Sequence, residues 1–355
     1  MSIAVDFATA RDDAGIRRLV AEEAMPGRVR IAFCREPEFS TGCAVTGEDV
    51  RILVARTEPE GHIVGVACRS VRHVFINGRE HRIGYLGQLR VDTRWRGRWL
   101  VSRGFAALER LHRTDPLPAY LASIVDQNHE ANAVLIDRRR RGFPVFREAA
   151  RYVTAAIRVG ARSGALRPAV DLTHGSAAEF DELSRFLTAE ATRRQLSSVW
   201  TADSLRRLGA YGLRPDDVRI ARRHGDIAGV IALWDQSAYK QSVIHSYTGW
   251  LRCVAPMLPR PGARLRSAYA ALIAIANDDL EVFSALLEEV CRTAALRGFE
   301  YLLVGLDMRD PLLKAVRAYR HVAYGSRLHL ASWDRGGSGY EQLDARPVYV
   351  DIATL

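Results

Sequence analysis

The chain has 355 residues, of which 48% are hydrophobic and 26% are charged, and its formal net charge is +10. This composition is typical of a soluble globular protein, and the length favours two domains over one. No apolar run approaches the roughly 20 residues of a membrane span, and the start of the chain lacks the layout of a secretory signal. We therefore expect a cytoplasmic protein that does not cross a membrane.

The positive charge predicts attraction to polyanions in general, which include nucleic acid, acidic substrates and nucleotide cofactors that carry phosphates. We expect no specific binding of nucleic acid, because the sequence shows neither an aromatic platform nor a helix-turn-helix signature. The five cysteines are widely spaced and include no C-x-x-C pair. This spacing predicts free thiols rather than a disulfide framework or a zinc site.

A faint internal repeat organises the chain. The sequence Asp-Val-Arg-Ile at residues 49–52 recurs at 217–220, and the glycine-bounded segment 61–66 recurs in the same order at 225–230. Each pair of segments predicts two strands joined by a short turn. The repeat therefore indicates two halves with a similar fold.

Both halves open with a predicted strand and an amphipathic helix. The strand and helix cover residues 5–9 and 14–23 in the first half, and 169–173 and 177–187 in the second. A small, flexible and polar stretch at 159–168 separates the halves. We predict an N-terminal domain over residues 1–164 and a C-terminal domain over residues 165–355.

The first half continues with a long antiparallel hairpin around Asn77-Gly78. This dipeptide tolerates the two positive φ angles of a type I′ turn. The second hairpin strand, at 80–91, runs directly into an arginine-rich turn, and an amphipathic helix follows from about Trp99. The hairpin therefore delivers a strand end and a helix start to the same place.

The junction between strand and helix at 89–101 is a candidate anion site. Unpaired amides and the positive end of a helix favour a negative charge there. Arg94, Arg96 and Arg98 raise the local potential and can bind phosphate oxygens. The junction therefore suits a pyrophosphate, and an ordinary exposed basic turn is the alternative interpretation.

The order of strand, hairpin, strand and then Leu-x-Val-Asp-x-x-x-Arg-Gly-Arg before an amphipathic helix resembles the GNAT (general N-acetyltransferase) superfamily. The resemblance implies an α+β fold of two tandem GNAT-like domains, each a mixed, mostly antiparallel sheet flanked by helices. It also implies acetyl-CoA or another acyl-CoA as the cofactor, and direct transfer of the acyl group to an amine.

The resemblance also implies which residues contact the cofactor. The family's pyrophosphate loop, Arg/Gln-x-x-Gly-x-Gly/Ala, places its leading arginine at Arg96 and its small positions at Trp99 and Val101, which depart from the pattern. In the family, the fourth and fifth strands part, and an amide of the fourth holds the thioester carbonyl, while an Asn follows the fifth strand. The implied cofactor contacts are Leu89, Arg90, Val91, Arg96, Gly97, Arg98, Trp99, Leu100, Val101 and Asn128.

Acyl transfer needs a base for the amine and a proton donor for the thiolate. Asp126, which follows a predicted strand, is the first candidate base, with Glu130 and His129 as alternatives, although Asp126 could simply cap a helix. The family's frequent donor tyrosine falls on Arg138 in the first half, whereas Tyr319 matches that position in the second. We therefore predict Asp126 and Tyr319 as catalytic residues, with a core role as the alternative for Tyr319. We predict no metal site.

The second half has Asp278 and Asp279 where phosphates would lie, and like charges repel, so we expect this half to lack a working cofactor loop. The leading hypothesis is an acyl-CoA-dependent N-acyltransferase whose first half binds the cofactor and whose second half closes the acceptor pocket. The predicted acceptor is a small-molecule amine of unknown identity, and a homodimer stays open. A degenerate, non-catalytic pair of GNAT folds that binds a ligand or protein partner is the alternative, favoured by Trp99, Val101 and Arg138.

Overall fold

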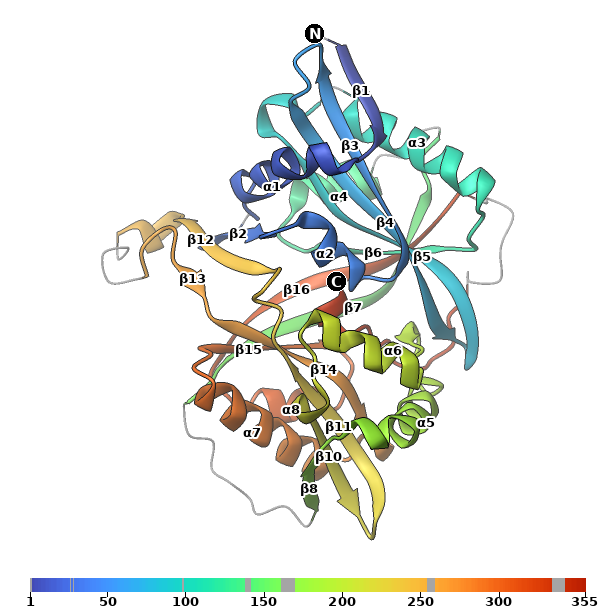
Figure 1. Ribbon diagram of the computed structural model, residues 1–355, viewed down its shortest axis with the longest axis vertical. Coiled ribbons are helices and arrows are strands. Elements are labelled where there is room, and N and C mark those ends of the chain that lie inside the picture. The colour runs from blue at the N-terminus through green and yellow to red at the C-terminus, as the bar shows by residue number, and fades with distance from the viewer. Residues whose placement is uncertain are drawn as a thin grey trace.

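The computed structural model describes residues 2–25, 27, 29–97, 99–137, 142–160, 170–253, 259–333 and 342–355. The two halves lie end to end along the long axis of the molecule, and strands of both halves meet between them (Figure 1). The segment at the end of the described chain lies at this junction rather than at an outer edge.

One 13-stranded sheet runs through both halves in the order β1-β3-β4-β5-β6-β16-β7-β15-β14-β11-β10-β8, with β9 paired to β4. The strands of the first half are β1 (Ser2–Phe7), β3 (Glu48–Glu58), β4 (Ile63–Ile76), β5 (Arg79–Val91), β6 (Tyr120–Val125) and β7 (Val145–Arg158). Those of the second half are β8 (Asp171–His174), β9 (Ser197–Ser198), β10 (Val218–Arg223), β11 (Asp226–Trp234), β14 (Ser267–Ile275), β15 (Tyr301–Asp307) and β16 (His321–Ser332).

A three-stranded sheet joins the halves at one side, because β2 of the first half pairs with β12 of the second. Its strands are β2 (Val29–Cys34), β12 (Gln241–Tyr247) and β13 (Arg264–Leu265). The helices are α1 (Asp13–Glu22), α2 (Phe39–Ala44), α3 (Leu100–Thr114), α4 (His129–Asn132), α5 (Phe180–Ala191), α6 (Ala202–Arg207), α7 (Leu280–Leu296) and α8 (Leu313–Val316).

The two halves exchange strands at the centre of the large sheet. β16 of the second half lies between β6 and β7 of the first, and β7 lies between β16 and β15. The prediction of two similar α+β halves is confirmed, but neither half completes its sheet alone. The predicted boundary between residues 164 and 165 lies outside the described residues and stays a prediction.

Strand pairing confirms the internal repeat and corrects one of its matches. Gly65 pairs with Ala55 in the first half, and Gly229 pairs with Ala221 in the second, so Ala55 and Ala221 are equivalent. The predicted match between the two Asp-Val-Arg-Ile segments is therefore wrong by two residues. Because side chains alternate between the faces of a strand, a shift of two keeps the same face buried and leaves the pattern intact.

Several local predictions can be compared with the structure. The hairpin is confirmed, and Asn77 and Gly78 have φ angles of 51° and 78°. The helix predicted to contain Tyr319 is shorter than expected, because α8 ends at Val316. The helix predicted to run to residue 141 is α4 followed by a π-helical turn that ends at Asp137, and the residues beyond lie outside the described chain.

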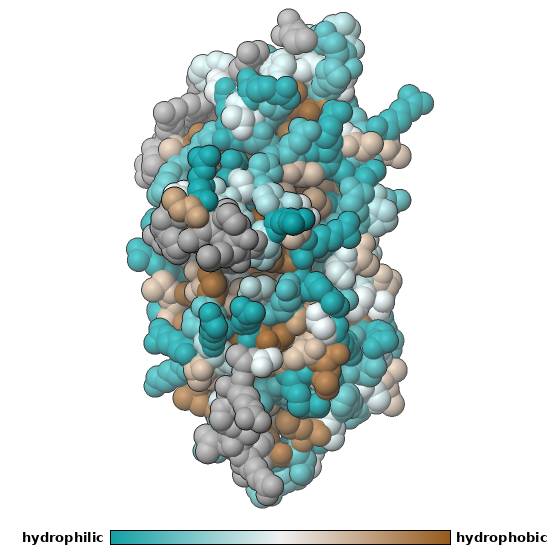
Figure 2. Space-filling model, turned by 90° about the vertical axis from the view of Figure 1, so that its left-hand side faces the viewer, coloured by the Kyte–Doolittle hydropathy of each residue, from teal (hydrophilic) through white to brown (hydrophobic). Residues whose placement is uncertain are grey.

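Figure 2 shows that hydrophilic residues cover much of one face of the molecule, while hydrophobic residues there form small groups. Within the described ranges, no helix has both the length and the apolar character that a membrane span requires. The five cysteines, Cys34, Cys43, Cys68, Cys253 and Cys291, are free thiols, as predicted.

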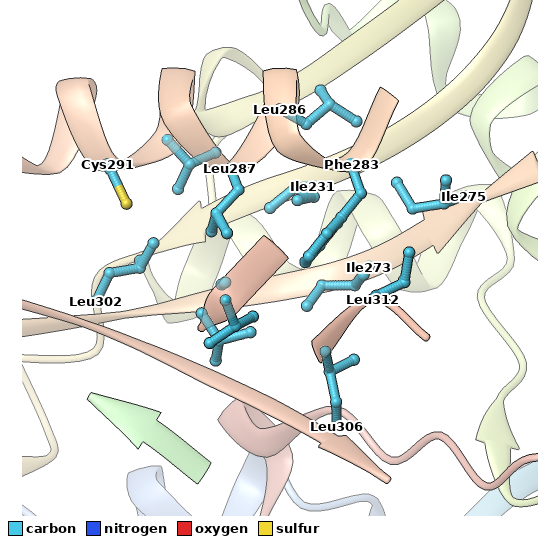
Figure 3. Close-up of a cluster of buried hydrophobic side chains, with 14 of the residues drawn as sticks. Ile231, Ile273, Ile275, Phe283, Leu286, Leu287, Cys291, Leu302, Leu306 and Leu312 are labelled. Carbon is cyan, nitrogen blue, oxygen red and sulfur yellow. The ribbon is translucent and has the colours of Figure 1, made fainter. Parts of the chain in front are cut away.

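A large hydrophobic cluster holds the second half together. Phe283, Leu286 and Leu287 of α7 belong to one buried cluster with Ile231 of β11 and Leu302 of β15 (Figure 3). Burial of one such side chain contributes about 1.5–3 kcal/mol. The second half is therefore firmly packed, and it contributes residues to the cavity of the first half.

Candidate active site

Strands β5 and β6 part at the centre of the first half. They pair from Gly84 with Tyr120 to Leu86 with Ala122, and no further. Beyond this point β5 stays paired with β4, and β6 stays paired with β16. The gap between them leads into a cavity of about 300 Å³. The parting of strands that the resemblance implied is therefore present, next to the arginine-rich turn.

A β-bulge in β5 turns backbone amides toward this cavity. The pairing of β5 with β4 shifts register near Gln88, which has a φ of 56°. The Asp92 amide donates to the Val64 carbonyl of β4 at 3.0 Å. Since the N–H groups of alternate residues point to opposite edges of a strand, the amides of Leu89 and Val91 face the cavity. The Arg90 amide faces β4 instead, although its side chain lines the cavity.

The second half repeats the bulge but fills the gap beside it. In β14, Leu272 has a φ of 52° at the equivalent register shift. The Leu272 amide donates to the Asp351 carboxylate at 2.7 Å, and the Ile273 amide donates to the Tyr349 hydroxyl at 2.9 Å. The cavity left there is only about 20 Å³.

The repeat adds the amide of Gln88 to those that face the cavity, because the left-handed φ of Gln88 interrupts the alternation along the strand. Gln88 and Leu89 are equivalent to Leu272 and Ile273, because both pairs begin at the left-handed residue of the bulge. In the described part of the chain, the two first-half amides have no side-chain acceptor. They are available to a ligand.

The cavity is lined by apolar side chains of the first half and by polar and apolar side chains of the second half. The apolar side chains of the first half include Leu53, Leu86, Phe105, Leu108 and Phe146. The second half contributes Lys240, Tyr269, Leu303, Tyr324, Ser326, Ile352 and Leu355. Both halves therefore build the cavity.

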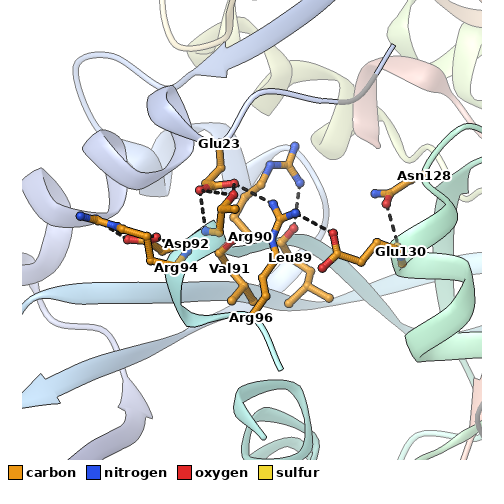
Figure 4. Close-up of polar contacts among 11 residues, drawn as sticks. Glu23, Leu89, Arg90, Val91, Asp92, Arg94, Arg96, Asn128 and Glu130 are labelled. Atoms are coloured by element: carbon orange, nitrogen blue, oxygen red, sulfur yellow. Dashed lines mark hydrogen bonds and ion pairs between the residues drawn. The ribbon is translucent and has the colours of Figure 1, made fainter. Parts of the chain in front are cut away.

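Two carboxylates hold the predicted phosphate-binding arginine (Figure 4). Arg96 donates to Glu23 at 2.7 Å and to Glu130 at 2.6 Å. Glu23 also accepts the Thr93 amide at 2.8 Å. Glu23 thus occupies the predicted anion site, and nothing in the sequence spacing marks it, because it directly follows α1, far from the turn in the sequence.

The remaining arginines of the turn are arranged differently. Arg94 folds back onto Asp92, with its Nη2 2.6 Å from a carboxylate oxygen, and this hydrogen bond lowers the pKa of Asp92. Arg98 lies outside the described residues. Of the two predicted arginines that the structure describes, Arg94 and Arg96, only Arg96 lies at the centre of the turn.

Trp99 stands where the family pattern has its first glycine, and its backbone has the conformation that favours glycine. Its φ is 61°, it precedes α3, and its side chain is 67% exposed. Gly97 has a φ of 77°. Leu100 and Val101, in the first turn of α3, line the cavity. The turn therefore keeps a glycine-like shape although its glycine is replaced.

The two predicted catalytic residues lie apart. Asp126 is exposed and accepts a hydrogen bond from Arg327 at 3.2 Å, and it is not among the residues that line the cavity. Tyr319 packs against the buried cluster of the second half and does not line the cavity either. Asn128 does line it, and its side chain caps α4 by accepting the Ala131 amide at 3.1 Å. The catalytic roles of Asp126 and Tyr319 stay predictions.

Sequence reasoning missed the tyrosines that do reach the cavity, namely Tyr85, Tyr269 and Tyr324. Tyr324 enters a first-half cavity on β16, so only the strand exchange explains its position. In the described part of the chain, no cluster of metal-ligating side chains is present.

The sequence matches no protein-family model and no curated protein. Among solved structures, the chain is similar to N-myristoyltransferase of Saccharomyces cerevisiae with bound myristoyl-CoA, with a TM-score of 0.65 and 10% identity, over 93% of this chain and 82% of that one. It is also similar to a GCN5-related N-acetyltransferase from Sphaerobacter thermophilus, with a TM-score of 0.58 and 13% identity, over 99% and 98% of the two chains. These likenesses show the fold, which is the tandem GNAT-like fold that the sequence predicted.

Proposed function

We propose that this protein is an acyl-CoA-dependent N-acyltransferase that holds its acyl donor, acetyl-CoA or a longer acyl-CoA, in the first half. The observation that carries the proposal is the open gap between β5 and β6, whose counterpart in the second half is filled by Tyr349 and Asp351. The amides of Gln88 and Leu89 suit the thioester carbonyl. They would stabilise the negative charge that develops on its oxygen during acyl transfer.

The residues fit the two ends of an acyl-CoA unequally. The cavity and its free amides fit the thioester end. At the phosphate end, Glu23 already occupies the Thr93 amide and the Arg96 guanidinium, so phosphates would have to displace it. A carboxylate bound to that amide supports the proposal that the turn attracts anions.

The acyl-CoA supplies an activated thioester, and the chain must manage two protons. When the amine nitrogen bonds to the carbonyl carbon and the carbon–sulfur bond breaks, the amine loses a proton and the thiolate gains one. Asp126 stays our candidate base, acting through a water because it lies outside the cavity. For the donor we propose Tyr324, because it lines the cavity and its phenol carries a proton at neutral pH.

A steric block tests the location of the cofactor. Gly104 lines the cavity from α3, and no described heavy atom lies within 4 Å of the position that its Cβ would take. Gly104→Phe should therefore fill the cavity without disturbing α3 and abolish acetyl-CoA binding in calorimetry. Gly209, in a short helical turn of the second half, has equally open surroundings, so Gly209→Phe is the matched control.

At about 100 times its Kd, acetyl-CoA should add roughly 2.7 kcal/mol to the free energy of unfolding of the wild type and of the control. If no acyl-CoA of any chain length binds the wild type, the proposed function is wrong. If Gly104→Phe binds acetyl-CoA as well as the control does, the location in the first half is wrong.

A second candidate function is a non-catalytic acyl-CoA-binding protein, and Trp99 favours it because its Cβ keeps the backbone away from phosphates. Release of free thiol from acetyl-CoA in the presence of a panel of small amines distinguishes the two. Binding without amine-dependent thiol release would support the non-catalytic alternative.

A further inference from the structure

The side chains that line the cavity have an unbalanced charge. Among the described lining residues, Arg35, Arg90 and Lys240 are cationic, and no aspartate or glutamate is present. The three come from distant parts of the chain, since Arg35 follows β2, Arg90 lies in β5 and Lys240 precedes β12. The fold therefore gathers positive charge in the cavity. A thioester is neutral, so binding it does not require this charge.

Arg35 is the most isolated of these cations. It is 5% exposed, and its guanidinium donates to the Cys34 carbonyl at 3.1 Å and to the Gln88 side chain at 3.4 Å. Its Nε has no partner, and no carboxylate of the described chain pairs with it. Burial of an uncompensated charge costs several kcal/mol, so a ligand that brings a negative charge would be strongly favoured.

Lys240 adds a second buried amine, whose pKa burial lowers well below its ordinary value, so that an anion beside it would favour the charged form. It is 8% exposed, and its Nζ donates to the Ala353 carbonyl at 2.8 Å, which uses one of its three protons. The nearby Asp351 carboxylate is occupied by two backbone amides, at 2.7 and 3.0 Å. Behind it, Arg72 is buried against backbone carbonyls and the ring of Tyr85, and it adds further positive charge.

Arg90 places this charge beside the reaction centre. It lies between the cavity-facing amides of Leu89 and Val91, and its guanidinium donates only to the Leu89 carbonyl, at 2.9 Å, while its Nε has no partner among the described residues. Burial, with the repulsion of Arg35 as the second cause, lowers the pKa of Arg90 to about 10. Both arginines line the same cavity, and Arg35 contacts Gln88, two residues before Arg90.

We propose that Arg35, Lys240 and Arg90 bind a carboxylate of the acceptor, so that the acceptor is a free amino acid rather than a simple amine. Arg35 contacts Gln88, whose own amide and that of Leu89 would hold the thioester. Carboxylate and attacking amine are therefore only a few bonds apart, as in an α- or β-amino acid. This inference rests on the proposed acyltransferase function for its chemistry, but the carboxylate site can be tested by itself.

The proposal can be tested by comparing the acetylation of amino acids with that of their carboxamides. The 20 common amino acids are offered with acetyl-CoA as free acids and as their carboxamides, and thiol release gives kcat/KM for each pair. For every amino acid that is used, we expect the free acid to exceed its carboxamide at least tenfold, because only the acid carries the charge. Equal use of both forms, or use of the carboxamides alone, would overturn the proposal.

A charge-removing variant assigns the preference to the cavity. Arg35→Gln should bring the ratio of acid to carboxamide close to one, while its Kd for acetyl-CoA changes less than about twofold. Arg18, an exposed arginine of α1, provides the matched control Arg18→Gln, which should keep the full preference. A preference that survives in Arg35→Gln contradicts the assignment. If that variant does not fold, Lys240→Met is tested against the same expectation.

Binding without cofactor separates this inference from the proposed function. N-acetyl amino acids and their carboxamides, which mimic products, are compared by calorimetry with the wild type. We expect at least tenfold tighter binding of the acids, even if acetyl-CoA itself fails to bind, and no preference would overturn the carboxylate site. If instead Arg35→Gln weakens succinyl-CoA binding and leaves acetyl-CoA binding intact, the carboxylate belongs to the acyl group and the amino-acid acceptor is wrong.

Discussion

At the same point of the repeated fold, Gln88 in β5 and Leu272 in β14 adopt left-handed φ angles of 56° and 52°. In the second half the adjoining amides donate to Asp351 and Tyr349, and in the first they face a cavity of about 300 Å³. The bulge itself is therefore a property of the fold. Whether the amides of the bulge can bind a ligand depends on which chain segment lies beside the bulge.

The helices that follow the two bulged strands differ in the same way. α7 is capped by its own carboxylate, because Asp279 accepts the amides of Glu281 and Val282 at 2.9 and 3.2 Å. α3 is preceded by Trp99, and within the described residues it has no side-chain cap hydrogen bond. The second half therefore satisfies part of its helix start with its own side chain, whereas the described residues provide no such side-chain cap for α3.

The largest expected effect comes from removing the group that fills the second gap. Asp351→Ala leaves the buried Leu272 amide without an acceptor, so we expect a loss of about 3 kcal/mol in the free energy of unfolding, measured with urea. Asp226, an exposed aspartate at the start of β11, gives the control Asp226→Ala, which should change it by less than about 0.5 kcal/mol. If both variants lose the same small amount of unfolding free energy, Asp351 does not hold the gap between β14 and β15 closed.

The equivalent first helices of the halves predict a smaller difference. Asp12 pairs with Arg56 and is 10% exposed, whereas Glu179 pairs with Arg222 and is 27% exposed. Asp12→Asn should lower the free energy of unfolding at pH 7 by about 2 kcal/mol, and Glu179→Gln by about 1 kcal/mol, because Arg222 keeps a second partner, Glu182.

The effect of Asp12→Asn should depend on pH. The hydrogen bond from Arg56 lowers the pKa of Asp12 well below its ordinary value. A group whose pKa is lowered by folding stabilises the protein above its unfolded pKa, about 3.9, and this stability is lost as the pH falls toward the folded pKa. Urea unfolding at pH 7, 4 and 3 should therefore show a shrinking difference between wild type and variant. A constant difference would mean that charge plays no part.

Two arginines of similar exposure compare the cofactor loops. Arg96 is 39% exposed beside the start of α3, and Arg223 is 40% exposed and pairs with Asp279 at the start of α7. Arg96→Ala should weaken acetyl-CoA binding in calorimetry about tenfold, because a charge-assisted contact with phosphate is lost. Arg223→Ala and Tyr319→Phe should leave the affinity unchanged. A loss confined to Arg223→Ala would place the phosphates in the second half.

The smallest expected effect concerns the backbone before each helix. Trp99→Gly removes a Cβ from a residue at φ 61°, so acetyl-CoA should bind about threefold more tightly, with a change of less than about 1 kcal/mol in the free energy of unfolding. Asn277, at φ 56° before α7, gives the matched variant Asn277→Gly, which should not alter binding. Weaker binding by Trp99→Gly would instead identify the indole as a cofactor contact.

The sequence predicted the features that depend on neighbouring residues. The turn at Asn77-Gly78 and the strand that leads into the arginine-rich turn both follow from local backbone preference. Contacts between distant segments could not be predicted, because no periodicity links Glu23 to Arg96 or Asp351 to Leu272. The cationic cavity wall is the clearest case, since Arg35 and Lys240 meet only after β2 pairs with β12.

The exchange of β7 and β16 has a consequence for biosynthesis. As the chain leaves the ribosome, β6 emerges long before β16, so its edge stays open while most of the second half is still being translated. An open strand edge is a site for mispairing with other chains. The cavity, which needs Tyr324 and Ser326 from β16, is therefore assembled late in translation, and a ribosome-bound nascent chain that stops before β16 should not bind acyl-CoA.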